Sequence, residues 1–144
     1  MSEEATLDEF IDSSDGNTQD TAWEKHQLRE LVEQLQAGGT PDTDKDEYYG
    51  GDILWVKTGE LGQLKIDSTE QTITEQGLEE STARLFPSKT VLIAMYGATT
   101  GEVSMLDTEA TTNQACCGII PDNRLLPHYL YYQLVHEKKQ LESL

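Results

Sequence analysis

The sequence has 144 residues, 36% of them apolar, and its 27 acidic against 10 basic side chains give a formal net charge of -17. This length and apolar content suit one globular domain with a core of its own. No apolar run approaches the roughly 18 residues of a membrane span, and the acidic start, MSEEATLDEF, does not resemble a signal peptide. We therefore expect a cytoplasmic protein with no membrane contact.

Acidic residues are concentrated at the start of the chain. Residues 1–20 hold seven of them and no lysine or arginine, which predicts an acidic disordered tail. The remaining 124 residues still carry 20 acids and 10 bases. Three explanations fit: a halophilic-type acidic protein from a cytoplasm of molar salt, a mimic of nucleic acid, or an ordinary acidic interaction domain.

The segment from Thr21 to Gly38 has the pattern of a short helix. TAWE matches a capping box, and Leu28, Leu31, Val32 and Leu35 follow at helical spacing until AGG ends the pattern. The next segment, GGTPDTDKDEYYGGD, is rich in glycine and aspartate and predicts a loop. ILWVKTGEL then predicts a strand that enters a turn.

Three strands are predicted in the second half of the chain. After the short alternation of LKIDSTEQTITEQGL and a helical turn broken by Pro87, the run TVLIAMY predicts a buried strand. EVSML alternates and predicts a half-exposed neighbour, and QACCGII predicts a third strand. Cys116 and Cys117 are adjacent, so they should point to opposite faces of that strand as packing residues without a disulfide.

A C-terminal helix is predicted from Pro127 onward, because proline suits the first helical position. Its leucines have the four-three spacing of a coiled-coil seam, with Glu137 where an apolar residue would complete the pattern. The seam either packs on its own domain or contacts a partner helix. The residues concerned are Leu130, Leu134, Leu141 and Leu144.

No catalytic or cofactor motif emerges from the sequence. GATTG lacks the spacing and the lysine of a nucleotide-binding loop. Asp122, Glu137 and Lys139 resemble a nuclease pattern, but Glu137 and Lys139 fall on the predicted helix, so the carboxylates should not converge on a metal. The three histidines have no ligands at metal-binding spacing. We expect no metal, no cofactor bound by this chain and no catalysis by it.

Four blocks of sequence, in order, resemble a known family. They are AGGTPDTDKDEYYGGDILWVKTGEL, ITEQGLEESTARLFPSKTVLIAMYGATTGEVSML, TNQACCGIIP and YLYYQL. Together they resemble a target recognition domain from the specificity (S) subunit of type I restriction-modification enzymes, from about Trp23 to the end. The resemblance implies a DNA target recognition domain over residues 21–126 and the start of a spacer helix over residues 127–144.

The resemblance also implies a non-catalytic subunit that reads one half of a split DNA target. Its partners would be double-stranded DNA, methyltransferase (M) subunits, restriction (R) subunits, and a second copy or second recognition domain bound through the C-terminal helix. The methyltransferase subunit would hold S-adenosylmethionine and methylate an adenine. For the fold we expect an α+β domain with a curved, mostly antiparallel sheet, short helices and a protruding C-terminal helix of coiled-coil type.

Candidate DNA contacts lie in turns and polar segments. Gly97 and Gly101 permit a tight reversal between paired strands, although Thr99 and Thr100 in the same turn have hydroxyls suited to phosphates. Asn113 and Gln114 have the chemistry for bidentate contact with adenine, but both types are also common in turns. The polar segments 42–49 and 65–76 are better places for sequence readout. Basic residues that would contact phosphate, or would simply be solvated, are Lys45, Lys57, Lys65, Arg84 and Lys89.

The negative charge opposes DNA binding, which normally uses a basic face. At about 1 M salt the screening length is only about 3 Å, so distant acids would repel DNA little. Two other functions remain as alternatives. An antirestriction-type DNA mimic would array acids at phosphate-like spacing on one face, and a nuclease would use Asp122 and Glu137.

Overall fold

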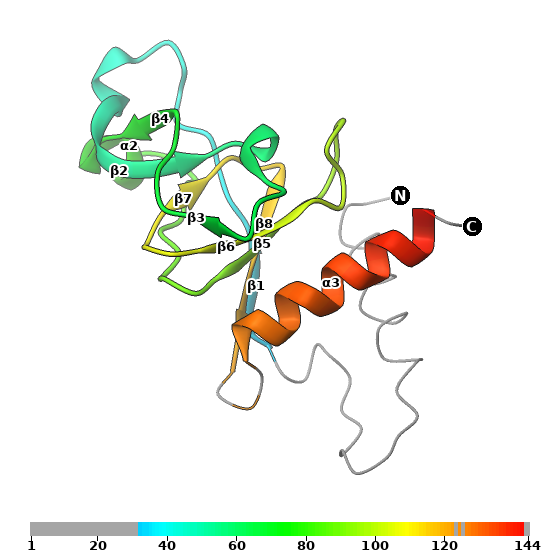
Figure 1. Cartoon of the computed structure of the whole chain (residues 1–144). Coiled ribbons are helices and arrows are strands. Elements are labelled where there is room, and N and C mark those ends of the chain that lie inside the picture. The colour runs from blue at the N-terminus through cyan, green and yellow to red at the C-terminus, as the bar shows by residue number, and fades with distance from the viewer. Residues whose placement is uncertain (1–31, 123, 125, 143–144) are drawn as a thin grey trace.

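Two β-sheets and a C-terminal helix make up the described part of the chain (Figure 1). The computed structural model describes residues 32–122, 124 and 126–142. The predicted acidic tail and the part of the predicted first helix before residue 32 therefore lie outside the described residues.

The larger sheet has five strands in the order β1-β8-β5-β6-β3. Neighbouring strands are antiparallel except β6 and β3, which run parallel. The strands span Val32–Ala37 (β1), Lys65–Ile66 (β3), Val91–Ala94 (β5), Val103–Leu106 (β6) and Cys116–Pro121 (β8).

The smaller sheet has three strands in the order β4-β2-β7. β4 and β2 are antiparallel, and β2 and β7 are parallel. Its strands span Tyr49–Val56 (β2), Gln71–Ile73 (β4) and Thr111–Thr112 (β7). The remaining elements are two short 3-10 helices, Asp46–Tyr48 (η2) and Thr58–Glu60 (η3), and the helices Glu75–Glu79 (α2) and Pro127–Glu142 (α3).

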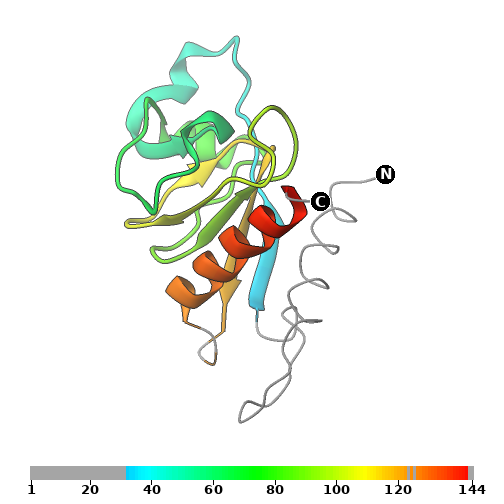
Figure 2. The ribbon, with the colours of Figure 1, turned by 45° about the vertical axis from the view of Figure 1, so that its right-hand side comes forward.

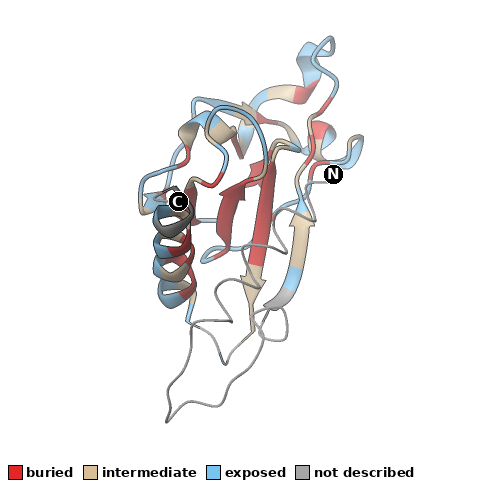
Figure 3. Cartoon of the chain, turned by 90° about the vertical axis from the view of Figure 1, so that its right-hand side faces the viewer, coloured by how far each residue is buried: buried red, intermediate tan, exposed pale blue. Residues whose placement is uncertain are grey.

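Helix α3 covers one face of the larger sheet (Figures 2 and 3). Leu130 and Leu134 are completely buried and pack with Ile93, Met105 and Ile119 from the central strands. Large apolar side chains of this kind each contribute about 1.5–3 kcal/mol when they leave water. The first three turns of α3 are thus held against the domain. Over this part the helix does not protrude, in contrast to the prediction.

A second apolar cluster fills the opposite face of the same sheet. Leu92 and Cys116 point to this side, whereas their neighbours Ile93 and Cys117 point toward α3, as expected for alternation along a strand. Gly118 leaves space for Phe86, since a Cβ there would meet its ring at 2.5 Å. Both cysteines are buried and lie on opposite faces of β8, so their predicted placement is confirmed.

Several sequence predictions agree with the structure. The α+β class, the mostly antiparallel pairing, the buried strand β5, the strand β8 and the helix from Pro127 are confirmed. The predicted strand from Ile53 is confirmed as part of β2, but β2 begins at Tyr49, within the segment predicted to be a loop. β6 differs from its prediction because all four of its residues are buried, between α3 on one face and the second cluster on the other. The single predicted sheet is replaced by two.

The segment from residue 32 to Gly38 was predicted to be helical, but Val32–Ala37 form the strand β1 instead. β1 runs antiparallel to β8, with Leu35 opposite Ile119, and the pairing continues to Ala37 opposite Cys117. The ladder satisfies backbone groups and places Leu35 against the α3-side cluster. Tertiary pairing here outweighs a local spacing that rested on a few apolar residues.

Among the described residues, no helix combines the length and the apolar character needed to cross a lipid bilayer.

Candidate nucleic-acid interface

The glycine turn between β5 and β6 has a conformation that requires glycine. Gly97 and Gly101 have φ values of 99° and 88°. The amide of Gly101 donates to the carbonyl of Ala94 at 2.9 Å, and the amide of Ala94 donates to the carbonyl of Glu102 at 3.0 Å. The predicted structural role of the two glycines is therefore confirmed.

Two other loops lie beside this turn, and we call the three together the loop cluster: residues 57–60, 97–101 and 113–115. The hydroxyl of Thr99 donates to the carbonyl of Thr58 at 3.1 Å. The amide of Asn113 donates to the carbonyl of Val56 at 2.9 Å. The loop cluster thus gathers these predicted residues from distant parts of the sequence: Lys57, Thr99, Thr100, Asn113 and Gln114.

Internal hydrogen bonds already engage the two candidate adenine readers. The side-chain oxygen of Asn113 accepts from the amide of Ala115 at 3.2 Å, which fixes the loop. The side-chain oxygen of Gln114 accepts from the hydroxyl of Thr40. A bidentate contact with adenine needs the amide oxygen and nitrogen together, so each residue would have to share or release its present bond.

Lys57 is the basic residue of the loop cluster, and it is paired. Its ammonium lies 2.8 Å from the carboxylate of Glu70. This hydrogen bond raises the pKa of Lys57 and lowers the pKa of Glu70 from their ordinary values. The backbone amides of Lys57 and Glu70 donate to the carboxylate of Glu60 at 2.9 and 3.0 Å, so η3 and the loop before β4 are joined. A phosphate would have to compete with Glu70 for Lys57.

Lys65 and Lys89 lie at the other end of β6 from the glycine turn. The ammonium of Lys65 is 3.9 Å from Asp107, and the amide of Lys89 donates to the carbonyl of Leu106 at 2.8 Å. Lys89 is exposed and has a φ of 77°, unusual for a residue with a side chain. β6 separates these two lysines from the loop cluster by about 10 Å of strand.

The other two basic candidates belong to neither group. Lys45 precedes η2, and its ammonium lies 5.5 Å from the centre of the Tyr48 ring. Arg84 is exposed and has no ion-pair partner within the part of the chain that the structure describes. The predicted basic residues therefore do not form one continuous patch.

Lys138 was absent from the sequence-based candidates, although it lies beside the glycine turn. It forms an ion pair with Glu102, and its methylene groups come within 3.3 Å of where a Cβ on Gly101 would lie. No local motif marks Lys138, because only the packing of α3 on β6 brings residues 101 and 138 together. Thr40 and Thr58 were missed because their partners, Gln114 and Thr99, are distant in the sequence.

The leucine seam of α3 faces inward. Leu130 and Leu134 are buried in this domain, so for these two leucines the structure favours the alternative that the seam packs on its own domain over contact with a partner helix. The physical reason is that the apolar face of the five-stranded sheet lies directly under the helix and is covered by it. The side chain of Leu141 and all of Leu144 lie outside the described residues, so their predicted partner contact stays a prediction.

The nuclease pattern does not assemble. Asp122 is held by Arg124, whose guanidinium lies 2.7 Å from its carboxylate, just after β8. Glu137 is on α3, ten residues or about 15 Å beyond Pro127. It is buried and accepts a hydrogen bond from Gln133 at 3.4 Å. Over residues 32–122, 124 and 126–142, no group of three acidic, cysteine or histidine side chains suits a metal ion.

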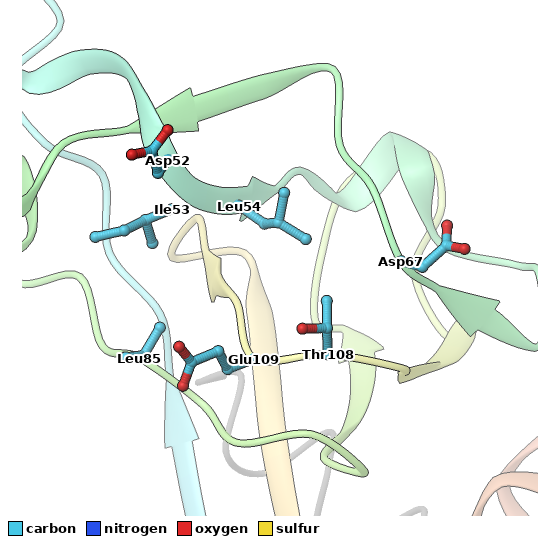
Figure 4. Close-up of a pocket in the computed structure, with 7 residues that line it drawn as sticks. All are labelled: Asp52, Ile53, Leu54, Asp67, Leu85, Thr108 and Glu109. Carbon is cyan, nitrogen blue, oxygen red and sulfur yellow. The ribbon is translucent and has the colours of Figure 1, made fainter.

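A pocket of about 320 Å³ lies away from the loop cluster, beside the middle of β2 (Figure 4). Its wall contains three acidic and no basic side chains, so it would repel a phosphate. The lining residues are Asp52, Ile53, Leu54, Asp67, Leu85, Thr108 and Glu109.

Comparisons with known proteins agree with this architecture. A specificity subunit of the type I restriction enzyme MjaIX from Methanocaldococcus jannaschii is 34% identical over 113 residues, covering 76% of this chain and 26% of that protein. The EcoR124I/EcoR124II specificity subunit from Escherichia coli is 30% identical over 101 residues, covering 67% of this chain and 25% of that protein. This chain thus spans about a quarter of the length of either relative.

Solved structures show the same fold. The HsdS subunit from Thermoanaerobacter tengcongensis matches with a TM-score of 0.62 and 13% identity, over 95% of this chain and 35% of that one. A chain from a study of complex assembly and conformational transition in the type I R-M system matches with a TM-score of 0.63 and 14% identity, over 96% of this chain and 35% of that one. A family model described as the type I restriction modification DNA specificity domain matches residues 21–144, and the chain belongs to this family.

Proposed function

We propose that this chain reads one half of a split DNA target as a specificity subunit, or part of one, of a type I restriction-modification system. The observation that carries the proposal is the family match over residues 21–144, joined to a fold that brings distant polar residues into one loop cluster. The nucleic-acid mimic finds no support among these relatives, all of which are specificity subunits.

The loop cluster is the proposed DNA-contacting surface. Its turn is rigidly positioned by the β5–β6 hairpin, and Thr99 is tied to η3, so the hydroxyls and amides around it hold fixed positions. Contacts of this kind orient a protein on the DNA backbone, while base edges are read by neighbouring side chains. Lys57 supplies positive charge within the cluster, and Lys65, Lys89, Lys45 and Arg84 are proposed phosphate contacts outside it.

The chain is proposed to act without catalytic residues of its own. An M subunit would carry S-adenosylmethionine and the methylation chemistry, and R subunits would join that complex. Because the chain spans about a quarter of its curated relatives, a second recognition domain or a second copy would supply the other half of the target. The expected place of action is the cytoplasm.

The test combines the purified chain with its cognate methyltransferase subunit and a random double-stranded DNA library in high-potassium buffer. Enrichment of a short motif only in the presence of both proteins is the expected result. A stable protein complex that retains no DNA, or that loses DNA when this chain is added, would contradict the proposal.

Two matched variants locate the contact surface. Lys57→Gln should weaken retention of the enriched motif about three- to tenfold, because one phosphate contact is lost at moderate salt. Arg124→Gln changes charge equally at an exposed position after the end of β8 that lies away from the loop cluster, and it should leave retention unchanged. Equal weakening by both variants would show that overall charge, rather than the loop cluster, governs binding.

A further inference from the structure

The edge of β2 beside the acidic pocket is uncovered. β7 pairs only with Trp55 and Val56, through Thr111 and Thr112. The chain before β7 turns away, because Ala110 pairs instead with Phe86 through two backbone hydrogen bonds of 2.8 and 3.1 Å. This divergence opens the gap between β2 and residues 108–109 that forms the pocket (Figure 4).

The pairing along β2 identifies its uncovered part. The carbonyl of Val56 accepts from the amide of Asn113 at 2.9 Å, and the carbonyl of Leu54 accepts from the hydroxyl of Thr111 at 2.6 Å. The pairing of β2 with β4 is irregular between Tyr49 and Ile53, and β7 meets β2 only at Trp55 and Val56. Within the described part of the chain, no strand therefore pairs with the part of β2 before Trp55 on the β7 side. Among the described residues, no backbone hydrogen bond joins Asp52 to residues 108–110.

The wall of the pocket combines an apolar floor with acidic sides. Ile53 and Leu54 are partly exposed on β2, and Leu85, 43% exposed, lies across the gap. Acidic side chains from three separate segments also line the pocket, and all three are exposed: Asp52, Asp67 and Glu109. Figure 4 shows Asp52, Ile53 and Leu54 on one side of the gap and Leu85, Thr108 and Glu109 on the other.

We propose that this edge binds a basic, extended segment of a protein partner, which adds to β2 as a strand and places an arginine or lysine side chain in the pocket. An uncovered strand edge offers backbone hydrogen bonds to an extended peptide, and adjacent pockets select its side chains. The apolar floor accepts the methylene groups of a long basic side chain, while the carboxylates pair with its charged end.

The charge of the pocket decides between possible occupants. DNA is disfavoured because three acidic side chains line the pocket, and a second copy of this chain is disfavoured by its net charge of -17. A basic protein segment complements both the pocket and the whole molecule. This surface is separate from the loop cluster, so the inference goes beyond DNA reading and does not depend on it.

The test titrates the full isotope-labelled chain with an acetylated, amidated heptapeptide that alternates valine and arginine. Affinity is measured by calorimetry, and contact is mapped by amide chemical shifts. Binding should shift the amides of residues 52–54, 85 and 108–109. A heptapeptide with glutamate in place of arginine should not bind, and one with a central proline, which removes a backbone donor, should bind at least several-fold more weakly.

Two charge-matched triple variants complete the test. Asp52→Asn with Asp67→Asn and Glu109→Gln should weaken peptide binding about tenfold, since each exposed pair contributes only about 0.2–1 kcal/mol. Asp44→Asn with Glu47→Gln and Glu79→Gln changes the net charge equally on other exposed residues and should change affinity less than twofold. Equal weakening in both triples, shifts confined to other surfaces, or undiminished binding of the proline peptide would overturn the proposal.

Discussion

At residue 97 the backbone requires glycine, whereas at residue 59 it does not. Gly97 has a φ of 99°, while Gly59 has no positive φ, and a Cβ added to Gly59 would meet no atom within 4 Å. Gly97→Ala should lower the free energy of unfolding by about 1–2 kcal/mol through backbone strain. Gly59→Ala should raise it by a few tenths to about 1 kcal/mol, because the unfolded chain loses freedom. Urea denaturation of both variants checks this, and equal effects would contradict it.

Cys116 makes the fold sensitive to alkali. Burial raises the pKa of its thiol from 9.0 to about 12. A raised folded-state pKa stabilises the protein below the unfolded value, and that stability is lost as pH rises from about 9 toward 12. The loss approaches about 1.4 kcal/mol per pH unit within this window. Denaturation midpoints at pH 8, 9 and 10 should therefore fall, and Cys116→Ala should reduce the slope. An unchanged slope in that variant would assign the effect to other groups.

At the scale of elements, α3 belongs to the domain core before it can serve any partner. Leu134→Ala should lower the free energy of unfolding by about 2–5 kcal/mol in the isolated chain, because it leaves a cavity against the sheet. Tyr132→Ala, at a side chain that is 57% exposed, should cost well under 1 kcal/mol. If the Leu134→Ala variant is as stable as the unmodified chain and loses only its binding to a partner helix, the seam would be a partner contact instead.

Strands with strong local signals were predictable from the sequence. Strands that are very short, or whose conformation is decided by pairing with a distant strand, were not. The unbroken run of β5 and the alternation of Cys116 and Cys117 follow from β-propensity and the period of two. β1 carries leucine at a spacing that also suits a helix, and only its ladder with β8 decides the matter. β3 and β7 have two residues each, and they are strands only because they pair with neighbouring strands.

The same distinction applies to the candidate site. Gly97 and Gly101 were identified because a tight reversal between paired strands commonly contains glycine, which is visible in the sequence. The neighbours Thr40, Thr58 and Lys138 left no such mark, since their contacts join residues about 40 or more positions apart or cross from helix to hairpin. The acidic pocket was equally hidden, because its carboxylates come from three separate segments.

For the whole molecule, the net charge of -17 should make stability depend on salt. Raising potassium chloride from about 0.05 M to about 1 M shortens the screening length to about 3 Å and removes most self-repulsion. The melting temperature should rise across this range, measured by circular dichroism. The variant with Asp44, Glu47 and Glu79 neutralised should melt higher at low salt and gain less from salt. A melting temperature that falls with salt would show that ion pairs such as Lys57 with Glu70 outweigh the repulsion.

The pairing of β1 with β8 also bears on how this domain can be exchanged between longer chains. Val32 lies opposite Pro121, so the chain enters the five-stranded sheet and leaves it toward α3 at nearly the same point. Domains whose ends lie close together tolerate insertion and circular permutation. A graft of residues 32–121 would therefore replace the loop cluster and leave the flanking segments at their original separation. The α3 helix of the receiving chain must then offer apolar side chains that pack on the sheet as Leu130 and Leu134 do here.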